Sequence, residues 1–298
     1  MMRIGLDIGG TKIELVVLSE QGELLHQQRT PTPTNDYRTF LDAIINLIKN
    51  AESQVGTVST IGVGCPGAIS PDTGVIKNAN CQVLNGHDLA ADLHNYFNLP
   101  VKIANDADCL ALSEFKDGAA KSASSSCFAA ILGTGCGGGV VVNSQLVTGV
   151  NRIAGEWGHN PLPDWDENVD GPEHICYCGR TKCLESYISG SGVSQNFQQI
   201  YHKNLTVPEI VELAEQGDPC AVEHMARFYD QLARSFAVII NIIDPEVIVI
   251  GGGVSNISSI YSHVPKIWQK YVFSDQVHTK LVRAKHGDSS GVRGAAWL

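Results

Sequence analysis

The stretch that decides the fold is MRIGLDIGGTKIELVVLSEQGELL, residues 2–25. Two apolar runs flank the glycine turn DIGGTK (7–12) and a third run follows them, so the stretch predicts three consecutive strands. The segment SCFAAILGTGCGGGVVVNSQLVTG (126–149) repeats the order of strand, glycine turn and strand. A supersecondary unit that recurs at a large offset indicates two related α/β domains that face each other.

The segments that follow each repeat alternate between strand and helix patterns. Residues 36–53 have apolar side chains at helical spacing, and short apolar strands are expected at 59–67 and 101–106, the second leading into a helix at 107–118. Alternation of this kind predicts an α/β sheet whose ligands bind at the carboxyl ends of its strands.

The second half of the chain begins after a shift in composition. Near residue 120 the sequence turns to Ala-Lys-Ser-Ala-Ser-Ser-Ser, which suggests a domain boundary. Residues 151–192 read as a long irregular segment, which in a compact domain is usually functional or disordered. A helix at 221–244, a strand at 246–250 and a terminal helix at 286–298 complete the predicted order.

Composition restricts the class of partner. The chain has 298 residues, 43% of them hydrophobic, and a formal net charge of −10. An acidic protein repels nucleic acid and anionic membranes, so we expect small-molecule ligands and no nucleic-acid partner. The chain shows neither a signal peptide nor an apolar run long enough to span a membrane, which predicts a cytoplasmic protein. Its nine cysteines are then expected to be reduced.

The two glycine turns, DIGGTK (7–12) and GTGCGGG (133–139), suit the binding of an anion. A glycine turn exposes backbone N–H groups and lets an anion approach without obstruction by a Cβ atom. Either turn alone could be a plain hairpin connection, but the pair favours a cradle for phosphates. A third run, 251–253, follows an apolar strand and is either an adenosine contact or a tight turn.

Asn105 and Asp106 stand at the carboxyl end of a predicted strand, where a helix begins. A carboxylate at this position could cap the helix. It could equally be a general base that accepts a hydroxyl proton during phosphoryl transfer. The residues alone leave both readings open.

Three cysteines fall within CYCGRTKC, residues 176–183. With His159, the thiols of Cys176, Cys178 and Cys183 make a Cys₃His set, and four nitrogen and sulfur ligands suit a closed tetrahedral zinc site. The spacing is not that of a common zinc finger, and free packing cysteines are the alternative. A closed site leaves no position for water, so we read the zinc as structural.

Zinc at this position would fix two carboxylates. Glu156 precedes His159 by three residues, and Glu185 follows the last cysteine by two. Together with Asn105 and Asp106 they would form an acceptor-rich surface for several sugar hydroxyls.

In this order, the motifs DIGGTK, CPG, NDAD, LGTGCGGG, GEWGH, C-x-C-x₄-C-x-E and IGGGVS resemble those of the ROK family of bacterial sugar kinases. The resemblance covers the whole chain. It implies the actin/hexokinase-type ATPase fold, with two α/β domains around a cleft. It places an N-terminal domain at 1–118, a C-terminal domain with the zinc loop at 119–286, and a terminal helix at 287–298 that packs back on the first domain.

The resemblance also implies roles for single residues. Asp106 is the implied catalytic base, and Asp7 is implied near Mg²⁺. The implied nucleotide-binding residues are Asp7, Gly9, Gly10, Thr11, Lys12, Gly133, Thr134, Gly135, Gly251, Gly252 and Gly253. The implied sugar contacts are Asn80, Asn105, Asp106, Glu156, His159 and Glu185. The implied zinc ligands are His159, Cys176, Cys178 and Cys183.

Within the family, VIKNANCQVLNG (75–86) and especially GEWGHNPLP (155–163) resemble the fructokinase (mannokinase) branch. N-acetylglucosamine kinases usually have Phe where Trp157 stands. Two residues depart from the family pattern. Asp108 stands where Asn is common, and its charge could raise the pKa of Asp106. Lys182 replaces the usual glycine before the last cysteine.

The sequence therefore predicts an ATP- and Mg²⁺-dependent hexose kinase that makes fructose 6-phosphate, with mannose and glucose as further substrates. N-acetylglucosamine kinase or glucokinase is the alternative within the family. A sugar-sensing regulator is the remote one, because the turn at residue 7 leaves no room before it for a DNA-binding domain. Members often form dimers, so a homodimer is compatible with the resemblance.

Overall fold

The computed structural model describes residues 1–77, 79 and 81–298. Its described residues divide into two compact units. Unit 1 comprises Met1–Lys121, Leu146–Ala154 and Lys285–Leu298, and unit 2 comprises Ser122–Gln145 and Gly155–Ala284.

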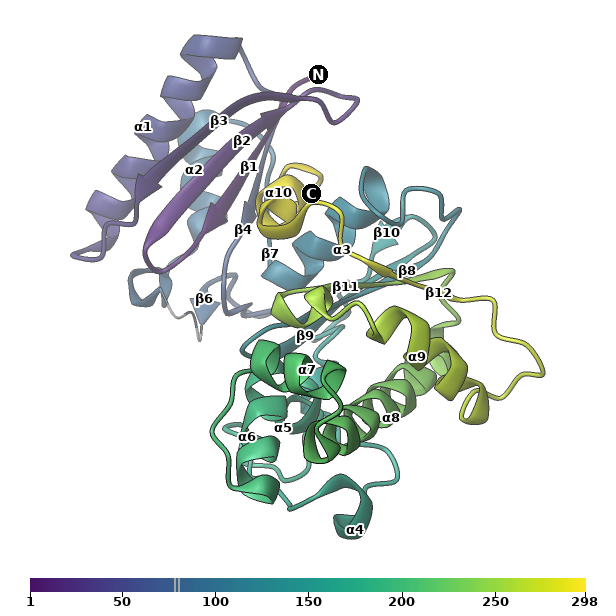
Figure 1. Ribbon diagram of the computed structural model, residues 1–298. Helices are drawn as coiled ribbons and strands as arrows, with labels where there is room; N and C mark the ends of the chain where they lie inside the picture. Colours follow the sequence, from purple (N-terminus) through teal and green to yellow (C-terminus); the bar gives the residue numbers. More distant parts are fainter. Residues whose placement is uncertain (78, 80) are drawn as a thin grey trace. The chain divides into compact units, whose positions relative to one another are not determined.

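Unit 1 is built on a five-stranded sheet with the strand order β3-β2-β1-β4-β7 (Figure 1). Its strands are β1 (Arg3–Ile8), β2 (Lys12–Leu18), β3 (Leu24–Pro31), β4 (Thr60–Gly64) and β7 (Val101–Ala104). The first three are antiparallel, whereas β4 runs parallel to both β1 and β7. The three consecutive strands predicted from residues 2–25 are thus present. A two-stranded hairpin, β5 (Ala68–Ile69) with β6 (Ile76–Lys77), lies outside this sheet.

The helices of unit 1 follow its strands closely. They are α1 (Tyr37–Val55), the 3-10 helix η1 (Gln82–Leu84), α2 (Leu89–Phe97), α3 (Asp106–Lys116), the 3-10 helix η5 (Gly287–Ser289) and α10 (Ser290–Ala296). Asp36 caps α1, because its side chain accepts a hydrogen bond from the Thr39 backbone N–H. Neither α2 nor the β5–β6 hairpin was predicted, since both are short and lack a strong apolar period.

The terminal helix α10 packs against β1 and β4 at unusually close range. A Cβ atom on Gly5 would lie 2.1 Å from the Val292 carbonyl oxygen, and one on Gly62 would lie 1.7 Å from that of Ala295. These strands therefore require glycine so that the helix backbone can approach the sheet. The tail, which the sequence predicts to be a helix, thus belongs to the core of unit 1.

Unit 2 repeats this sheet. Its strand order is β10-β9-β8-β11-β12, with β8 and β9 antiparallel and β11 parallel to both β8 and β12. The strands are β8 (Cys127–Leu132), β9 (Cys136–Val142), β10 (Gln145–Leu146), β11 (Val247–Gly251) and β12 (Lys280–Arg283). The correspondence with the sheet of unit 1 accounts for the sequence repeat and agrees with the predicted fold class.

The helices of unit 2 include several short ones within the segment 151–192, which was predicted to be irregular. Unit 2 contains the 3-10 helices η2 (Trp157–His159), η3 (Gly253–Asn256) and η4 (Trp268–Lys270), with α4 (Glu167–Asp170), α5 (Glu185–Ile188), α6 (Gly190–Tyr201), α7 (Val207–Glu215), α8 (Pro219–Ile243) and α9 (Ile260–Ile267). The predicted irregular range 151–192 was therefore too long at its end, because α6 already begins at Gly190 with Ser189 as its cap.

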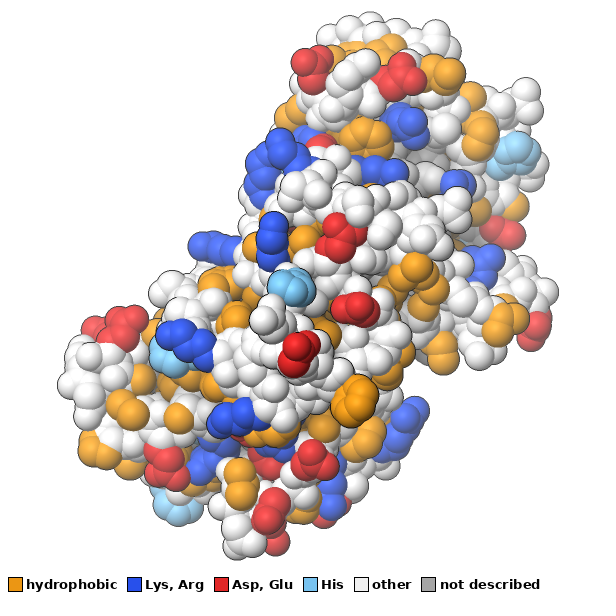
Figure 2. Space-filling view, turned by 90° about the vertical axis from the view of Figure 1, so that its right-hand side faces the viewer, with side chains coloured by type: hydrophobic (Ala, Val, Ile, Leu, Met, Phe, Trp, Pro, Cys, Tyr) orange, Lys and Arg blue, Asp and Glu red, His pale blue; other side chains and the backbone are white. Residues whose placement is uncertain are grey.

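The surface carries both signs of charge. On the face shown in Figure 2, blue Lys and Arg side chains are interspersed with red Asp and Glu side chains. Among the described residues, no helix is both long and apolar enough to cross a membrane.

Candidate active site

The first glycine turn, between β1 and β2, is closed by its own backbone and by a residue beyond β3. The Gly9 N–H donates to the Lys12 carbonyl oxygen at 2.9 Å. Thr32 donates its N–H to the Thr11 carbonyl at 3.0 Å and its hydroxyl to the Gly9 carbonyl at 2.7 Å. Gly10, Thr11 and Lys12 remain exposed. Thr32 could not be identified from the sequence, because its contact with the turn depends on how β3 pairs with β2.

Asn105, and not Asp106, caps helix α3. The Asn105 side chain accepts a hydrogen bond from the Asp108 N–H at 2.7 Å. The alternative that Asp106 is the cap is therefore wrong. Asp106 is the first helical residue, its carboxylate is exposed, and its Oδ1 accepts from the Ala107 N–H at 2.9 Å. Because Asn105 is the cap, the Asp106 carboxylate remains available as a general base.

Asp7 and Asp106 lie near enough to influence each other. Burial, then the charges of Glu14 and Asp106, raise the pKa of Asp7 to about 6, while Lys12 opposes the shift. Glu14 is itself only 2% exposed and pairs with Arg29 at 2.9 Å. Unit 1 thus gathers two predicted site carboxylates, a lysine and a glycine turn at one end of its sheet.

The raised pKa predicts that Asp7→Asn stabilises the protein at neutral pH. The folded state holds the Asp7 proton more tightly than the unfolded state, so ionisation of this carboxylate costs stability. The cost is complete above about pH 6 and absent below about pH 4. We expect Asp7→Asn to raise the free energy of unfolding at pH 7.5 by roughly 1–3 kcal/mol, and the gain to disappear at pH 4.

Urea denaturation of both proteins at pH 7.5 and pH 4 measures this difference. Asp36→Asn is the control, because the Asp36 carboxylate caps α1 and its pKa is lowered by the hydrogen bond from the Thr39 side chain. That variant is expected to gain nothing. A gain for Asp7→Asn that is the same at both pH values would contradict the assigned cause.

The second glycine turn, between β8 and β9, meets the third run at the end of β11. Gly252 has a φ of 78°, and a Cβ atom there would lie 2.5 Å from the Leu132 carbonyl oxygen. A side chain at Gly252 is thus excluded by both backbone conformation and space. Thr134, Gly252 and Gly253 are exposed. Unit 2 therefore brings together the two glycine segments that the sequence assigns to the nucleotide.

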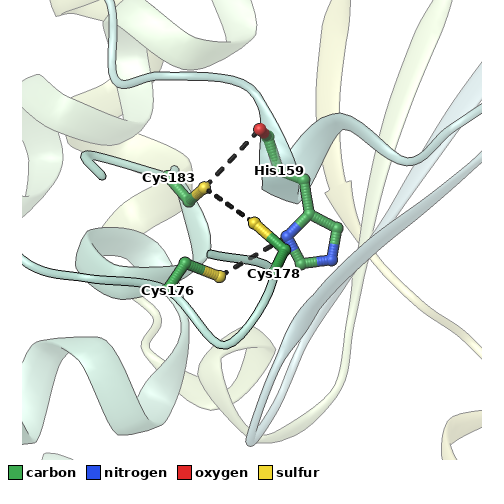
Figure 3. A group of neighbouring side chains, drawn as sticks. All are labelled: His159, Cys176, Cys178 and Cys183. Atoms are coloured by element: carbon green, nitrogen blue, oxygen red, sulfur yellow. Dashed lines mark hydrogen bonds between the residues drawn. The ribbon is translucent and has the colours of Figure 1, made fainter. Parts of the chain in front are cut away.

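The predicted metal ligands converge on one point (Figure 3). The ligand atoms of His159, Cys176, Cys178 and Cys183 all lie within 4.8 Å of one another. Cys176 Sγ is 3.6 Å from His159 Nδ1, and Cys178 Sγ is 3.6 Å from Cys183 Sγ. Tetrahedral zinc with sulfur and imidazole ligands requires separations of about 3.5–3.8 Å between ligand atoms. The donor set and these two separations fit zinc, and the four ligand atoms, all within 4.8 Å of one another, could hold one ion.

Two backbone features shape the cysteine loop. The Cys176 N–H donates to the Arg180 carbonyl at 2.8 Å, and the Gly179 N–H returns to the Cys176 carbonyl at 2.9 Å. Burial raises the pKa of Cys183 to about 12, whereas a backbone hydrogen bond from Arg180 lowers the pKa of Cys178.

Lys182 adopts the left-handed conformation that its usual family counterpart, glycine, favours. Its φ is 62°, which costs a side-chain-bearing residue about 1–2 kcal/mol. The Lys182 ammonium lies 4.0 Å from the centre of the Trp165 ring and 3.8 Å from Glu173. These contacts offset part of the cost, so the loop keeps a glycine-type backbone without the glycine.

Backbone hydrogen bonds outside the Cys₃His cluster also hold the segments 160–162 and 182–184 together. The Leu162 N–H donates to the Lys182 carbonyl at 2.7 Å, and the Leu184 N–H donates to the Asn160 carbonyl at 2.8 Å. This short ladder joins the segment after His159 to the segment around Cys183.

Farther along the loop, a buried ion pair fixes it to helix α8. Arg234, 5% exposed, bonds to Asp170, which is fully buried, and to the Pro163 carbonyl oxygen. Arg234 also reaches Asp230 on its own helix at 2.9 Å. None of these residues stood out in the sequence, because their partners are distant in the chain.

The His159 imidazole lies between the cysteines and Tyr177. His159 turns Nδ1 toward the cysteines, and its Nε2 lies 3.0 Å from the Tyr177 hydroxyl. Tyr177 is exposed, so the sequence reasoning missed an aromatic side chain at the predicted sugar-binding surface.

Trp157 points away from this surface. Its ring is 3% exposed, donates Nε1 to the Gly137 carbonyl at 2.9 Å, and packs between Phe128 and Phe236. The residue that favoured the fructokinase branch is therefore a core residue of unit 2.

The structure does not test two further expectations, those for Asn80 and for Asp108. Asn80 lies outside the described residues. Asp108 is 8% exposed on α3, and its effect on the pKa of Asp106 stays a prediction.

A model of the ROK family matches residues 3–298. The N-acetyl-D-glucosamine kinase of Vibrio cholerae serotype O1 is 40% identical over 305 residues, covering 100% of this chain and 99% of that protein. The crystal structure of a ROK hexokinase from Thermus thermophilus superposes with a TM-score of 0.86 at 29% identity, covering 100% of this chain and 97% of the other. A ROK family glucokinase from Streptomyces griseus, in complex with glucose and AMPPNP, gives a TM-score of 0.73 at 26% identity and covers 99% of this chain and 98% of its own.

Proposed function

Because the chain belongs to the ROK family, we propose that it is a sugar kinase that transfers the γ-phosphoryl group of ATP to the 6-hydroxyl of N-acetylglucosamine. The observation that carries the proposal is the 40% identity to an N-acetyl-D-glucosamine kinase along 100% of the chain. The site chemistry is compatible with it, since the chain has an exposed carboxylate, glycine turns and a Cys₃His cluster.

In this proposal Asp106 accepts the proton of the 6-hydroxyl as the hydroxyl oxygen attacks the γ-phosphorus. The exposed N–H groups of the two glycine turns and the Lys12 ammonium stabilise the charge of the phosphate oxygens. Mg²⁺ neutralises part of that charge when bound, and Asp7, a half-buried carboxylate beside the first turn, is the residue that would hold it.

Sugar recognition is assigned to acceptor groups. Asn105, Glu156, His159 and Glu185 would bind hydroxyl groups, with the His159 Nε2 edge turned away from the cysteines. Zinc at the cluster would cross-link the two segments that carry these groups, which keeps the carboxylates in a fixed relation.

The comparisons favour N-acetylglucosamine over fructose. The fructose expectation rested on the segments 75–86 and 155–163, and the ring of Trp157 in the second lies in the core and donates to a backbone carbonyl. A Phe or Trp at this position changes core packing directly and the sugar surface only through the backbone.

A coupled assay of ADP release across four sugars tests the proposal. We expect the highest kcat/KM for N-acetylglucosamine, with lower values for glucose, mannose and fructose. A higher kcat/KM for fructose would restore the fructokinase prediction. A chain that binds sugar but releases no ADP with any of the four would support the regulator class.

A further inference from the structure

The Glu185 carboxylate lies against the second glycine turn. Its Oε2 accepts a hydrogen bond from the Cys136 N–H at 2.9 Å, at the point where β9 begins. The same oxygen would lie 2.7 Å from a Cβ atom placed on Gly135. The predicted sugar-binding carboxylate is thus in direct contact with the predicted phosphate-binding turn.

The other end of this turn is held by the residue that begins α6. The Gly190 N–H donates to the Gly133 carbonyl at 2.7 Å, and a Cβ atom on Gly190 would lie 3.0 Å from that oxygen. Within the turn, the Gly133 N–H donates to the Gly135 carbonyl at 3.0 Å. The short segment 185–190 therefore forms hydrogen bonds with both ends of the turn.

The bond from Cys136 to Glu185 differs in kind from the bond at Gly190. A carboxylate that accepts from a backbone N–H makes a charge-assisted hydrogen bond, about twice as strong as a neutral one. Its strength matters because a phosphate turn works only if its donors already point at the ligand when the ligand arrives.

We propose that Glu185 is a positioning residue for the second glycine turn, in addition to its predicted contact with the sugar. The inference rests on the proposed function, because it assumes that this turn binds nucleotide phosphates. One carboxylate then joins the sugar surface to the phosphate turn within unit 2, and the link begins two residues after the cluster ligand Cys183.

Nucleotide binding without sugar tests the inference. The dissociation constant of Mg²⁺–AMPPNP is measured by calorimetry with no sugar present. We expect Glu185→Ala to weaken binding roughly 10-fold, because the turn loses a charge-assisted bond. Glu185→Gln should restore most of the affinity, since its amide oxygen can still accept from the Cys136 N–H. Unchanged or tighter binding by Glu185→Ala would overturn the proposal.

Glu156→Gln is the matched control. After burial, the charges of Glu185 and Glu156 both raise the pKa of Cys136, so this variant removes a carboxylate from the same region. It should lower sugar affinity but leave the AMPPNP dissociation constant within about two-fold of the wild-type value. An equal loss in Glu156→Gln and Glu185→Ala would assign the effect to local charge and refute a role in positioning.

A measurement without any ligand separates this inference from the proposed function. Amide hydrogen exchange of the peptide covering 132–137 should be faster in Glu185→Ala and close to wild-type in the Glu185→Gln and Glu156→Gln variants. Unchanged exchange in Glu185→Ala refutes the positioning role, whatever the sugar assay shows. Faster exchange in a chain that phosphorylates none of the sugars would leave the contact intact and refute only the kinase assignment.

Discussion

Replacing Asp106 by asparagine is expected to lower kcat by about 10²–10⁴-fold, which is the usual contribution of a general base. The side chain keeps its size, and its amide oxygen can still accept from the Ala107 N–H. The cap of α3 is Asn105 and stays in place, so we expect little change in stability. The KM values for sugar and ATP should change far less than kcat, because the variant removes a proton acceptor and not a binding surface.

Steady-state kinetics of Asp106→Asn beside Asp108→Asn give the sharpest comparison. Both variants remove one carboxylate from the first turn of α3, but Asp106 is exposed and Asp108 is 8% exposed. Asp108→Asn should retain most of kcat, because the buried Asp108 carboxylate is not the proposed proton acceptor. Similar losses in both variants would show that charge on the helix, and not a base, carries the effect.

The strands and glycine turns could be predicted because their signals are local. The apolar runs on either side of residues 7–12 and 133–139 fix both the strand positions and the turns. The strand order was not predicted, but its recurrence in the two sheets agrees with the repeat. The metal ligands could also be found, because three of the four lie within eight residues.

Contacts between distant segments could not be predicted. Thr32 reaches the first turn through the pairing of β3 with β2, and Arg234 reaches Asp170 across 64 residues. Trp157 shows a second limit. The branch assignment depended on the identity of this residue, whereas the sequence does not show that its side chain is buried in the core.

Lys182 shows how local rules can be overridden. A lysine argues against a left-handed backbone, yet its φ is 62°. The ladder between Leu162 and Lys182 and the contact of its ammonium with the Trp165 ring hold the residue there. Tertiary contacts outside the motif therefore decide the conformation of the loop.

Removal of the proposed zinc from the Cys₃His cluster is expected to destabilise the protein and impair sugar use together. In Cys178→Ser, the set of His159 and three thiols loses one of its four ligands. The ladder at 160–162 and the Arg234–Asp170 pair do not involve the cluster atoms and should keep the loop partly ordered. We therefore expect partial loss: a free energy of unfolding lower by about 2–4 kcal/mol and a kcat/KM for the sugar lower by roughly 10–100-fold.

Metal content by mass spectrometry, thermal denaturation and sugar kinetics check this expectation in one preparation. Cys220→Ser is the matched control, because Cys220 is a half-buried thiol on α8 outside the cluster. The control should keep one zinc per chain and wild-type kinetics, whereas Cys178→Ser and chelator-treated wild-type protein should change alike. Because zinc at the cluster would fix Cys183, and Glu185 lies two residues beyond it, metal loss should also speed amide exchange at 132–137. Wild-type melting and wild-type sugar kinetics in Cys178→Ser would show that the ladder and the buried ion pair hold the loop without metal.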